Sequence, residues 1–197
     1  IGFGNIAQAL AKGLSSSNYN VCAYDVLKSK SKTIRALNVA CLSSSKEVVE
    51  KSKIIILCIK PSHFSQVLDN ISSHVTNKKI IISLGAGVSL GFISKFLKNR
   101  KLVRIMPNLS SAFGNGFTAV TFNKFLLKKE RSFIIKILDS FGKTMELKNE
   151  SFFDKITALS GSGPAFFAFY LDSIIKYAID SGFTRKQAVD IAYNTSG

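Results

Sequence analysis

Apolar runs alternate with amphipathic segments along most of the chain. Short apolar runs rich in β-branched residues predict strands at Asn20–Asp25, Asn38–Leu42, Ile54–Ile59, Lys79–Leu84, Lys101–Met106 and Phe117–Phe122. Segments with a helical spacing of apolar residues predict helices at Ile6–Leu14, Lys30–Leu37, Lys46–Ser52, His63–Val75, Leu90–Leu97 and Lys128–Phe141. Strands that alternate with helices are typical of a parallel sheet flanked by helices. The run Ile54–Ile59 is apolar throughout, which predicts a central strand buried on both faces.

The pattern changes near Asn149, where the strand signals stop and a domain boundary is expected. Pro164–Ser181 predicts one long helix, because Pro suits the first turn of a helix and Gly182 follows its end. The first half of this helix is apolar on nearly every side, so other helices or a second subunit must enclose it. Thr184 then begins another helix, in which Gln187 completes a capping box.

A glycine-rich segment opens the chain. Gly2–Ala7 reads GFGNIA and fits the pattern G-x-G-x-x-G/A in front of a predicted helix. In dinucleotide-binding domains the first glycine allows the tight turn, the second lets the backbone approach the pyrophosphate, and the small third residue packs helix against sheet. The phosphates then meet the free amides at the helix start. A plain glycine turn before a helix would give the same pattern, so the motif needs support from elsewhere in the chain.

Asp25 supplies such support at the end of the next predicted strand. An acid at this place normally hydrogen-bonds the ribose 2′-hydroxyl of a dinucleotide. A carboxylate repels a 2′-phosphate and therefore favours NADH, whereas Lys28, Ser29 and Lys30 follow at once and could bind that phosphate. The residues leave NADH and NADPH both open, and the alternative interpretation of Asp25 is a solvated loop acid or a cap.

Further candidates follow the ends of predicted strands, where ligands bind in open α/β sheets. Lys60 and Pro61 follow one strand, and Lys60 is either a cofactor contact or an exposed basic residue. Gly85–Gly87 offers small residues that let a ring or a ribose approach the backbone, although a plain turn also explains them. Asn108 could hydrogen-bond a substrate or the nicotinamide amide, but Asn after Pro is also common in turns.

The segment Ser160–Ala165 carries two hydroxyls and two glycines directly before the long predicted helix. Unpaired amides and the positive end of the helix dipole make such a terminus an anion site. Ser162 could equally serve as the N-cap of its own helix. The residues alone support both interpretations.

Composition excludes several classes of protein. The net charge is +15, but the lysines are scattered and no segment alternates basic and aromatic residues as single-strand binders do, so we expect no nucleic-acid partner. No apolar run is long enough to cross a membrane, and no signal peptide is visible. Cys22, Cys41 and Cys58 lie apart without a C-x-x-C pair, which indicates reduced thiols in a cytoplasmic protein and no metal site. His63 and His74 lack a nucleophile partner and are expected to be structural.

Taken together, these segments resemble the pyrroline-5-carboxylate reductase family. Ile1–Ala7 resembles its opening motif, and Cys58–Pro61 (CIKP) resembles its V-K-P strand end. Ile82–Ser89 (ISLGAGVS) is similar to its S-x-A-A-G-V stretch, and Arg104–Asn108 (RIMPN) to its R-x-M-P-N. Thr157–Phe166 (TALSGSGPAF) is nearly its signature T-A-L-S-G-S-G-P-A-Y, and Gly182–Arg185 (GFTR) resembles its G-L-P-R. The order of these matches along the chain is more specific than any one motif.

The chain departs from the family pattern at a few positions. Leu109 and Ser110 replace the family's T-P, Phe183 and Thr184 replace L-P, and Phe166 replaces Tyr. None of these changes removes an obvious catalytic group, although the first could alter the wall of the substrate pocket.

The resemblance implies an α/β fold with a Rossmann-type dinucleotide-binding domain at residues 1–149, followed by the start of an all-helical dimerisation and substrate domain at 150–197. It implies reduction of 1-pyrroline-5-carboxylate to L-proline by hydride from NADPH or NADH, the last step of proline biosynthesis, in a homodimer or higher homo-oligomer. The family's later S-P-G-G-T-T segment would follow Gly197 and its first strand would precede Ile1. We therefore expect a fragment that is inactive or aggregates by itself.

The resemblance also assigns roles to residues. The implied cofactor contacts are Ile1, Gly2, Phe3, Gly4, Asn5, Ile6, Asp25, Ser45, Cys58, Ile59, Lys60, Pro61, Leu84, Gly85, Ala86 and Asn108. Ser162 and, less directly, Ser160 would hydrogen-bond the substrate, and Glu150 would help to order that site; Ser45 and Glu150 rest on the resemblance alone. A protonated cyclic imine is already an electrophile, so the enzyme needs to align it with the nicotinamide rather than to supply a nucleophile.

Two alternative functions compete with this one. Another two-domain reductase of the β-hydroxyacid dehydrogenase type would need a lysine base in the helical domain, for which Lys155 and Lys176 are the early candidates. A non-catalytic dinucleotide-binding paralogue would not need Ser160, Ser162 and Asn108, which this chain retains.

Overall fold

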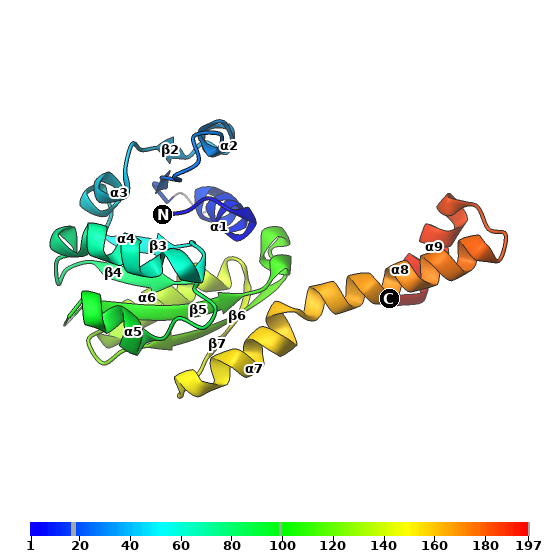
Figure 1. The fold of residues 1–197 in the computed structure, drawn as a ribbon. Helices are drawn as coiled ribbons and strands as arrows, with labels where there is room; N and C mark the ends of the chain where they lie inside the picture. The colour runs from blue at the N-terminus through cyan, green and yellow to red at the C-terminus, as the bar shows by residue number, and fades with distance from the viewer. Residues whose placement is uncertain (17–18, 99, 197) are drawn as a thin grey trace.

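The chain forms an α/β part and a helical arm that extends away from it (Figure 1). This computed structural model describes residues 1–16, 19–98 and 100–196. The α/β part contains the elements from α1 to β7, and the helical arm contains those from Glu150 to Ser196.

Two sheets form the middle layer of the α/β part. A small parallel sheet pairs β1 (Cys22–Ala23) with β2 (Ala40–Cys41). The larger sheet has the order β3 (Ile54–Leu57), β4 (Ile80–Ser83), β5 (Lys101–Pro107), β6 (Gly116–Phe122) and β7 (Gly142–Glu146). The backbone of Ile1 and Gly2 joins the two sheets, because the Cys58 amide donates to the Ile1 carbonyl and the Gly2 amide to the Tyr24 carbonyl, each at 2.8 Å.

Helices cover both faces of the larger sheet (Figure 1). One face packs against α3 (Ser45–Lys51), α4 (Phe64–Ile71) and α5 (Leu90–Phe96). The opposite face packs against α1 (Asn5–Ser16) and α6 (Lys128–Asp139), while α2 (Lys30–Ala36) lies over the small sheet. Serine caps fix where two of these helices begin: Ser44 accepts from the Glu47 amide, and Ser89 from the Phe92 amide. The result is the three-layer arrangement that the alternating pattern predicts.

The sheet differs from the predicted one in three ways. First, β6 runs antiparallel to β5, so the prediction of an entirely parallel sheet is wrong at this pair. Second, β7 was not predicted, because its sequence GKTME lacks an apolar run and most of its residues are exposed. Third, the run from Ile54 is not buried on both faces: Ile55 and Leu57 are fully buried, whereas Ile54 and Ile56 are only half-buried.

Short single-turn helices flank α4 and follow β5. The predicted helix His63–Val75 consists of η1 (Pro61–His63), α4 and η2 (Ser72–His74). The segment after Asn108 forms η3 (Leu109–Phe113), which packs beside α1. This contact brings the loop after β5 close to the helix that follows the glycine-rich turn.

The helical arm is a chain of helical segments. It begins with η4 (Glu150–Phe152) and α7 (Phe153–Ile156), passes through the π-helical turn η5 (Thr157–Gly161), and continues as α8 (Gly163–Asp180). The last helix, α9 (Arg185–Ser196), packs against α8, and Thr184 and Gln187 form the predicted capping box at its start. The long helix is therefore confirmed, with bounds one residue from those predicted.

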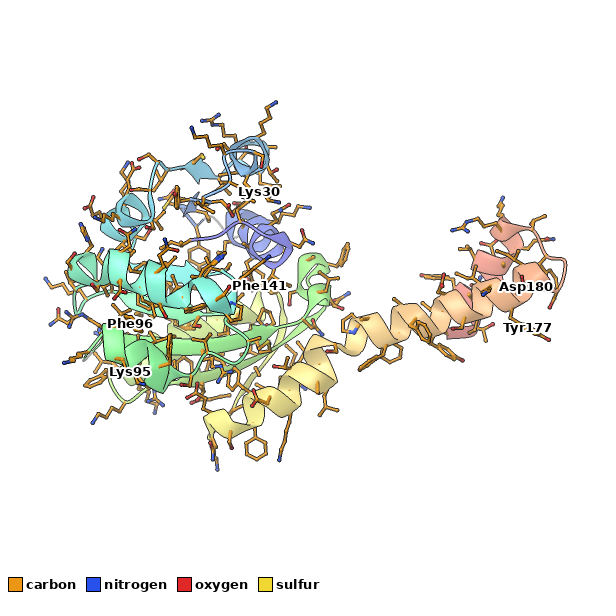
Figure 2. All side chains as sticks on the ribbon, in the orientation of Figure 1. Lys30, Lys95, Phe96, Phe141, Tyr177 and Asp180 are labelled. Carbon is orange, nitrogen blue, oxygen red and sulfur yellow. The ribbon has the colours of Figure 1, made fainter. Side chains whose placement is uncertain are left out.

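The side chains of α8 are largely uncovered. Figure 2 shows them projecting from the ribbon between the α/β part and α9, with Tyr177 near the outer end. Phe166, Phe167, Phe169 and Tyr170 are all mostly exposed. Within the described residues, no helix is both long enough and apolar enough to cross a membrane.

Candidate active site

The glycine-rich turn is held between the two sheets. Gly2 has a φ of +83°, and a Cβ on this residue would lie 2.4 Å from the Cys58 carbonyl oxygen, so only glycine fits here. At Gly4 a Cβ would meet nothing within 4 Å, which leaves open space in front of the first turn of α1. The Gln8 amide bonds the Gly4 carbonyl at 3.0 Å, so the helix begins directly after the turn. Turn and helix start therefore fit a pyrophosphate, as the motif predicts.

Asp25 faces this turn rather than open solvent alone. One carboxylate oxygen accepts from the Phe3 amide at 2.6 Å, and the other from the Leu27 amide at 2.8 Å. The acid thus ties the glycine-rich turn to the loop after β1, which is more than a solvated loop acid would do. Lys28 and Ser29 are exposed in the same loop, at the start of α2.

Other predicted cofactor contacts lie on different parts of the same edge. Ser45 is buried, and its hydroxyl accepts from the Asn70 side chain at 2.9 Å, so it faces α4 rather than solvent. Cys58 and Ile59 follow β3 and are half-buried, whereas Lys60 and Pro61 are exposed. Removal of the sulfur from water raises the pKa of the Cys58 thiol to about 11, which disfavours the nucleophilic thiolate at pH 7.

The loop after β4 closes tightly over the core. A Cβ on Gly85 would lie 2.8 Å from the Phe64 ring and from Val88, so glycine is required by packing. The Gly85 amide bonds the buried Ser83 hydroxyl at 3.2 Å, while Ala86 is exposed on the outer side of the loop. Gly85 and Ala86 therefore present backbone rather than bulky side chains at the carboxyl end of β4, while the Leu84 side chain packs against the core.

Asn108 links the sheet to the helical arm. Its side-chain oxygen Oδ1 accepts from the Phe117 backbone amide at 3.1 Å, and its side-chain nitrogen Nδ2 donates to the Ser160 hydroxyl at 3.4 Å. With Pro164, these two residues also line a hollow of about 720 Å³ that extends along α8 to Leu171. The structure thus brings together two predicted site residues from distant parts of the sequence.

The serine-rich segment adopts a π-helical turn. The Ser162 amide bonds the Thr157 carbonyl at 3.0 Å, one residue further back than in an α-helix, and the Ser162 hydroxyl donates to the same carbonyl at 3.3 Å. Ser162 precedes α8 without capping it by its side chain, so the N-cap interpretation of its hydroxyl is wrong. Such turns are rare and often occur at functional sites.

Glu150 does not contact either serine. Its carboxylate accepts from Arg104 and from the Leu90 amide, each at 2.8 Å. Arg104 was not assigned a role from the sequence, although a charged residue within the apolar run Leu102–Met106 was a visible signal. In the part of the chain that the structure describes, no cluster of His, Cys, Asp and Glu is suited to hold a metal ion.

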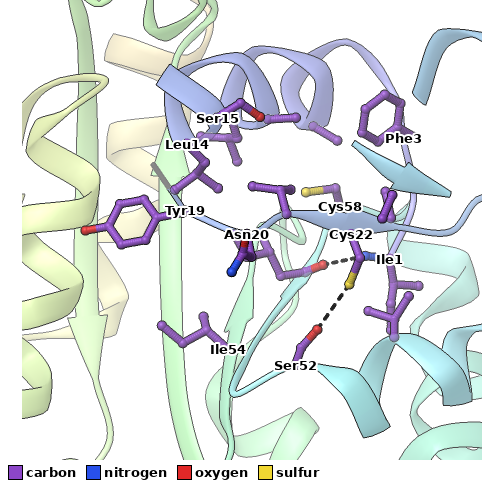
Figure 3. A pocket seen from close by; sticks show the side chains of 18 of the residues that line it. Ile1, Phe3, Leu14, Ser15, Tyr19, Asn20, Cys22, Ser52, Ile54 and Cys58 are labelled. Carbon is purple, nitrogen blue, oxygen red and sulfur yellow. Dashed lines mark hydrogen bonds between the residues drawn. The ribbon is translucent and has the colours of Figure 1, made fainter. Parts of the chain in front are cut away.

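A larger hollow, of about 1030 Å³, lies between β1 and β3 and is lined by Ile1, Cys22 and Cys58 (Figure 3). Its walls are mainly apolar, and the Cys22 sulfur lies 3.3 Å from the Ser52 hydroxyl. The hollow contains neither the serines of the π-helical turn nor Asn108. The predicted site residues Asn108 and Ser160 therefore line the smaller of these two hollows.

Comparison with known proteins agrees with this geometry. Residues 1–87 match the family model described as NADP oxidoreductase, coenzyme F420-dependent, and residues 150–196 match the model described as pyrroline-5-carboxylate reductase dimerisation. The pyrroline-5-carboxylate reductase of Aquifex aeolicus is 35% identical over 198 residues, which cover 99% of this chain and 73% of the relative. The chain belongs to the pyrroline-5-carboxylate reductase family.

Solved structures of this family share the fold. The 1-pyrroline-5-carboxylate reductase of Streptococcus pyogenes superposes with a TM-score of 0.91 at 29% identity, over 99% of this chain and 74% of that one. The Plasmodium falciparum pyrroline carboxylate reductase, solved with NADP bound, superposes with a TM-score of 0.89 at 27% identity, over 98% and 73% of the two chains. The predicted succession of a Rossmann-type domain and a helical dimerisation domain is thereby confirmed.

Proposed function

We propose that this chain reduces 1-pyrroline-5-carboxylate to L-proline with NADPH or NADH, as an oxidoreductase of proline biosynthesis. The observation that carries the proposal is the contact between Asn108 and Ser160. It sets the π-helical turn of the arm against the carboxyl edge of the sheet, where the nicotinamide end of a dinucleotide lies in this architecture. The family membership supplies the reaction.

The residues that would hold the cofactor fit a dinucleotide. The turn Gly2–Ile6 would bind the phosphates, because Gly4 leaves space in front of the amides of α1. Asp25 would face the ribose, and Lys60 and Leu84–Ala86 would line the path towards the nicotinamide. When bound, the reduced nicotinamide supplies the hydride that adds to the C=N carbon of the imine.

The chain's own side chains would orient the imine. Ser160 and Ser162 are half-buried at the π-helical turn, and their hydroxyls can hydrogen-bond the substrate's carboxylate or ring nitrogen. Asn108 holds Ser160 in place from the sheet. Alignment of two reacting carbons is the main demand of this reaction, since the protonated imine needs no covalent activation.

Serine variants test this assignment. We expect Ser160→Ala and Ser162→Ala to raise the KM for 1-pyrroline-5-carboxylate while NADPH binding stays near the wild-type value. Ser173→Ala is the matched control, because the Ser173 hydroxyl also bonds a carbonyl of its own helix but lies further out on α8. A wild-type protein that binds dinucleotide but does not oxidise it with this imine would refute the proposed function.

The geometry disfavours a β-hydroxyacid dehydrogenase. That reaction needs a lysine base facing the substrate, yet the Lys155 ammonium lies over the exposed ring of Phe152, 5.2 Å from its centre. Lys176 is exposed on the outer half of α8. Assays with β-hydroxy acids and their oxidised forms should therefore show no turnover.

Assembly and domain division complete the proposal. The chain forms a homo-oligomer, and we infer a homodimer or higher homo-oligomer built on the exposed aromatic side chains of α8. The match of the dimerisation model to residues 150–196 supports a boundary between residues 149 and 150.

The scattered basic residues favour a small-molecule substrate over nucleic acid. The free thiols of Cys22, Cys41 and Cys58 favour the cytoplasm as its location.

A further inference from the structure

Arg104 is a charged residue inside an otherwise apolar strand. Its neighbours in β5, Val103 and Ile105, are fully buried, and its own side chain is only 5% exposed. Its Nη1 donates to Glu150, and its guanidinium lies 4.5 Å from the centre of the buried Phe153 ring. Among the described residues, Nε and Nη2 have no hydrogen-bond partner. A buried and incompletely paired guanidinium is a poor way to stabilise a fold, so this charge calls for a second explanation.

The partner, Glu150, connects three segments through one oxygen atom. Its Oε1 accepts from Arg104 of β5 and from the amide of Leu90, the first residue of α5. Leu90 follows directly after the loop that contains Gly85 and Ala86. Glu150 itself begins the helical arm, ahead of the π-helical turn. The carboxylate therefore joins α5, which follows the loop assigned to the nicotinamide, to the helical arm, which carries the turn assigned to the imine.

We propose that Arg104 and Glu150 are positioning residues, which set the distance between the Gly85–Ala86 loop and the Ser160–Ser162 turn. This inference rests on the proposed function, because the two segments hold cofactor and substrate only if the chain is a reductase of this imine. Glu150 acts through the Leu90 amide and Arg104 rather than on the substrate. Phe153, stacked on the guanidinium, fixes the first turn of α7 to the same point.

Loss of the pair should affect the reaction rather than cofactor binding. Hydride transfer requires close contact of two carbons, and a misplacement of about 1 Å can reduce the rate roughly 100-fold. The glycine-rich turn and Asp25 hydrogen-bond to each other, the turn is also bonded to the segments that follow β1 and β3, and none of these bonds involves Glu150. A change confined to the Arg104–Glu150 pair should therefore leave the binding of dinucleotide nearly unchanged.

The test compares four variants of the intact protein: Glu150→Gln, Glu150→Ala, Arg104→Met and the double variant Arg104→Met/Glu150→Gln. For each, kcat and KM are measured with 1-pyrroline-5-carboxylate, NADPH binding by fluorescence, and the unfolding midpoint in urea. We expect Glu150→Ala to lower kcat by roughly 10- to 100-fold. Glu150→Gln should lower it less, because the amide oxygen still accepts from Leu90.

The double variant separates positioning from stability. A single replacement leaves one buried charge unpaired, whereas the double variant removes both charges and should recover the unfolding midpoint. We expect its kcat to stay low although its stability recovers. If kcat returned together with the unfolding midpoint, the pair would act through stability alone and the inference would be wrong. Should Glu150→Ala not fold, Glu150→Gln and the double variant decide the question.

A second ion pair on the same strand provides the control. Lys101, at the end of β5 opposite to Asn108, pairs with Glu130 on α6. Lys101→Met/Glu130→Gln should move the unfolding midpoint without changing kcat. A wild type without turnover of the imine would overturn the proposed function and this inference together. An active wild type whose Glu150→Ala and double variants keep the wild-type kcat would overturn the inference alone.

Discussion

Strand β4 and helix α8 are both strongly apolar, but their surroundings are opposite. Every residue of β4 is buried, and Ile81 is 0% exposed between helices and neighbouring strands. In α8 only Ala178 is buried, and Phe169 is 76% exposed. An apolar run thus predicts that a segment will be covered, but not by what. The α/β part covers β4 with its own helices, whereas the described residues leave most of α8 uncovered.

The largest expected effect is in the core of the α/β part. Phe64 is fully buried and lies under Gly85. Phe64→Ala should lower the free energy of unfolding by roughly 3–5 kcal/mol, because it removes apolar contacts and leaves a cavity. Urea denaturation would measure it. Phe113→Ala, at an 83% exposed ring, is the control and should change stability by less than about 0.5 kcal/mol. Equal decreases in the free energy of unfolding for the two variants would contradict the contrast between buried and exposed aromatic rings.

Substitutions in the helical arm should change the oligomeric state rather than the stability of the fold. Phe169→Lys places a charge on the exposed face of α8, where each apolar side chain covered by a partner contributes roughly 1.5–3 kcal/mol. We expect dissociation in analytical ultracentrifugation and loss of turnover, with NADPH binding retained. Phe133→Lys makes the same change on α6, at a ring of the α/β part, and should leave the assembly intact. Dissociation by Phe133→Lys but not by Phe169→Lys would place the interface elsewhere.

Cofactor choice is expected to depend on the α/β part alone. A carboxylate near the ribose repels a 2′-phosphate, so the wild type should bind NADH at least as well as NADPH. Asp25→Ser should shift the ratio of the two dissociation constants towards NADPH by on the order of 1–3 kcal/mol. The variant should also bind both cofactors somewhat more weakly, since it loses the acceptor for the Phe3 amide. A wild type strongly selective for NADPH would show that Lys28 or Lys30 dominates.

The smallest effect concerns the acid dependence of stability. Hydrogen bonds from Lys51 and from the amide and hydroxyl of Ser43 lower the pKa of Glu47 from 4.5 to about 2. A folded-state pKa below the unfolded value stabilises the protein above pH 4.5, and this contribution is lost as the pH falls towards 2. The unfolding midpoint of Glu47→Gln should therefore lie slightly below that of the wild type at pH 6 and converge with it near pH 2. A constant difference would exclude Glu47 as the titrating group.

Local signals account for what the sequence predicted well. The β-branched run from Ile54 and the capping box of Thr184 and Gln187 each depend on residues close together in the sequence. A strand and a helix start form there as predicted, although the strand is not buried on both faces. Strand β7 escaped prediction because its polar residues lie at the exposed edge of the sheet. The antiparallel direction of β6 depends on pairing with β5, which periodicity does not encode.

Long-range contacts explain which features of the candidate site the sequence did not predict. The glycine-rich turn and Asp25 follow a known spacing, so the sequence could pair them, and in the structure the Phe3 amide does donate to Asp25. The partners of Glu150 lie on β5 and at the start of α5, and no local pattern joins them. The π-helical turn is likewise invisible in the sequence, because it changes the hydrogen-bond ladder by one residue without a distinct composition.

The near-continuous helical path from Phe153 to Asp180 couples the position of its outer end to the tilt at the π-helical turn. Helix α8 has 18 residues, so its length is about 27 Å at about 1.5 Å per residue. A tilt of about 5° at the π-helical turn would move its outer end by about 2 Å over this length. The same relation holds in reverse. If contacts in an oligomer hold the outer end of α8 to within about 2 Å, the tilt of α8 at the π-helical turn is restricted to about 5°. Contacts far from Ser160 and Ser162 can therefore limit how much the orientation of the bound imine varies.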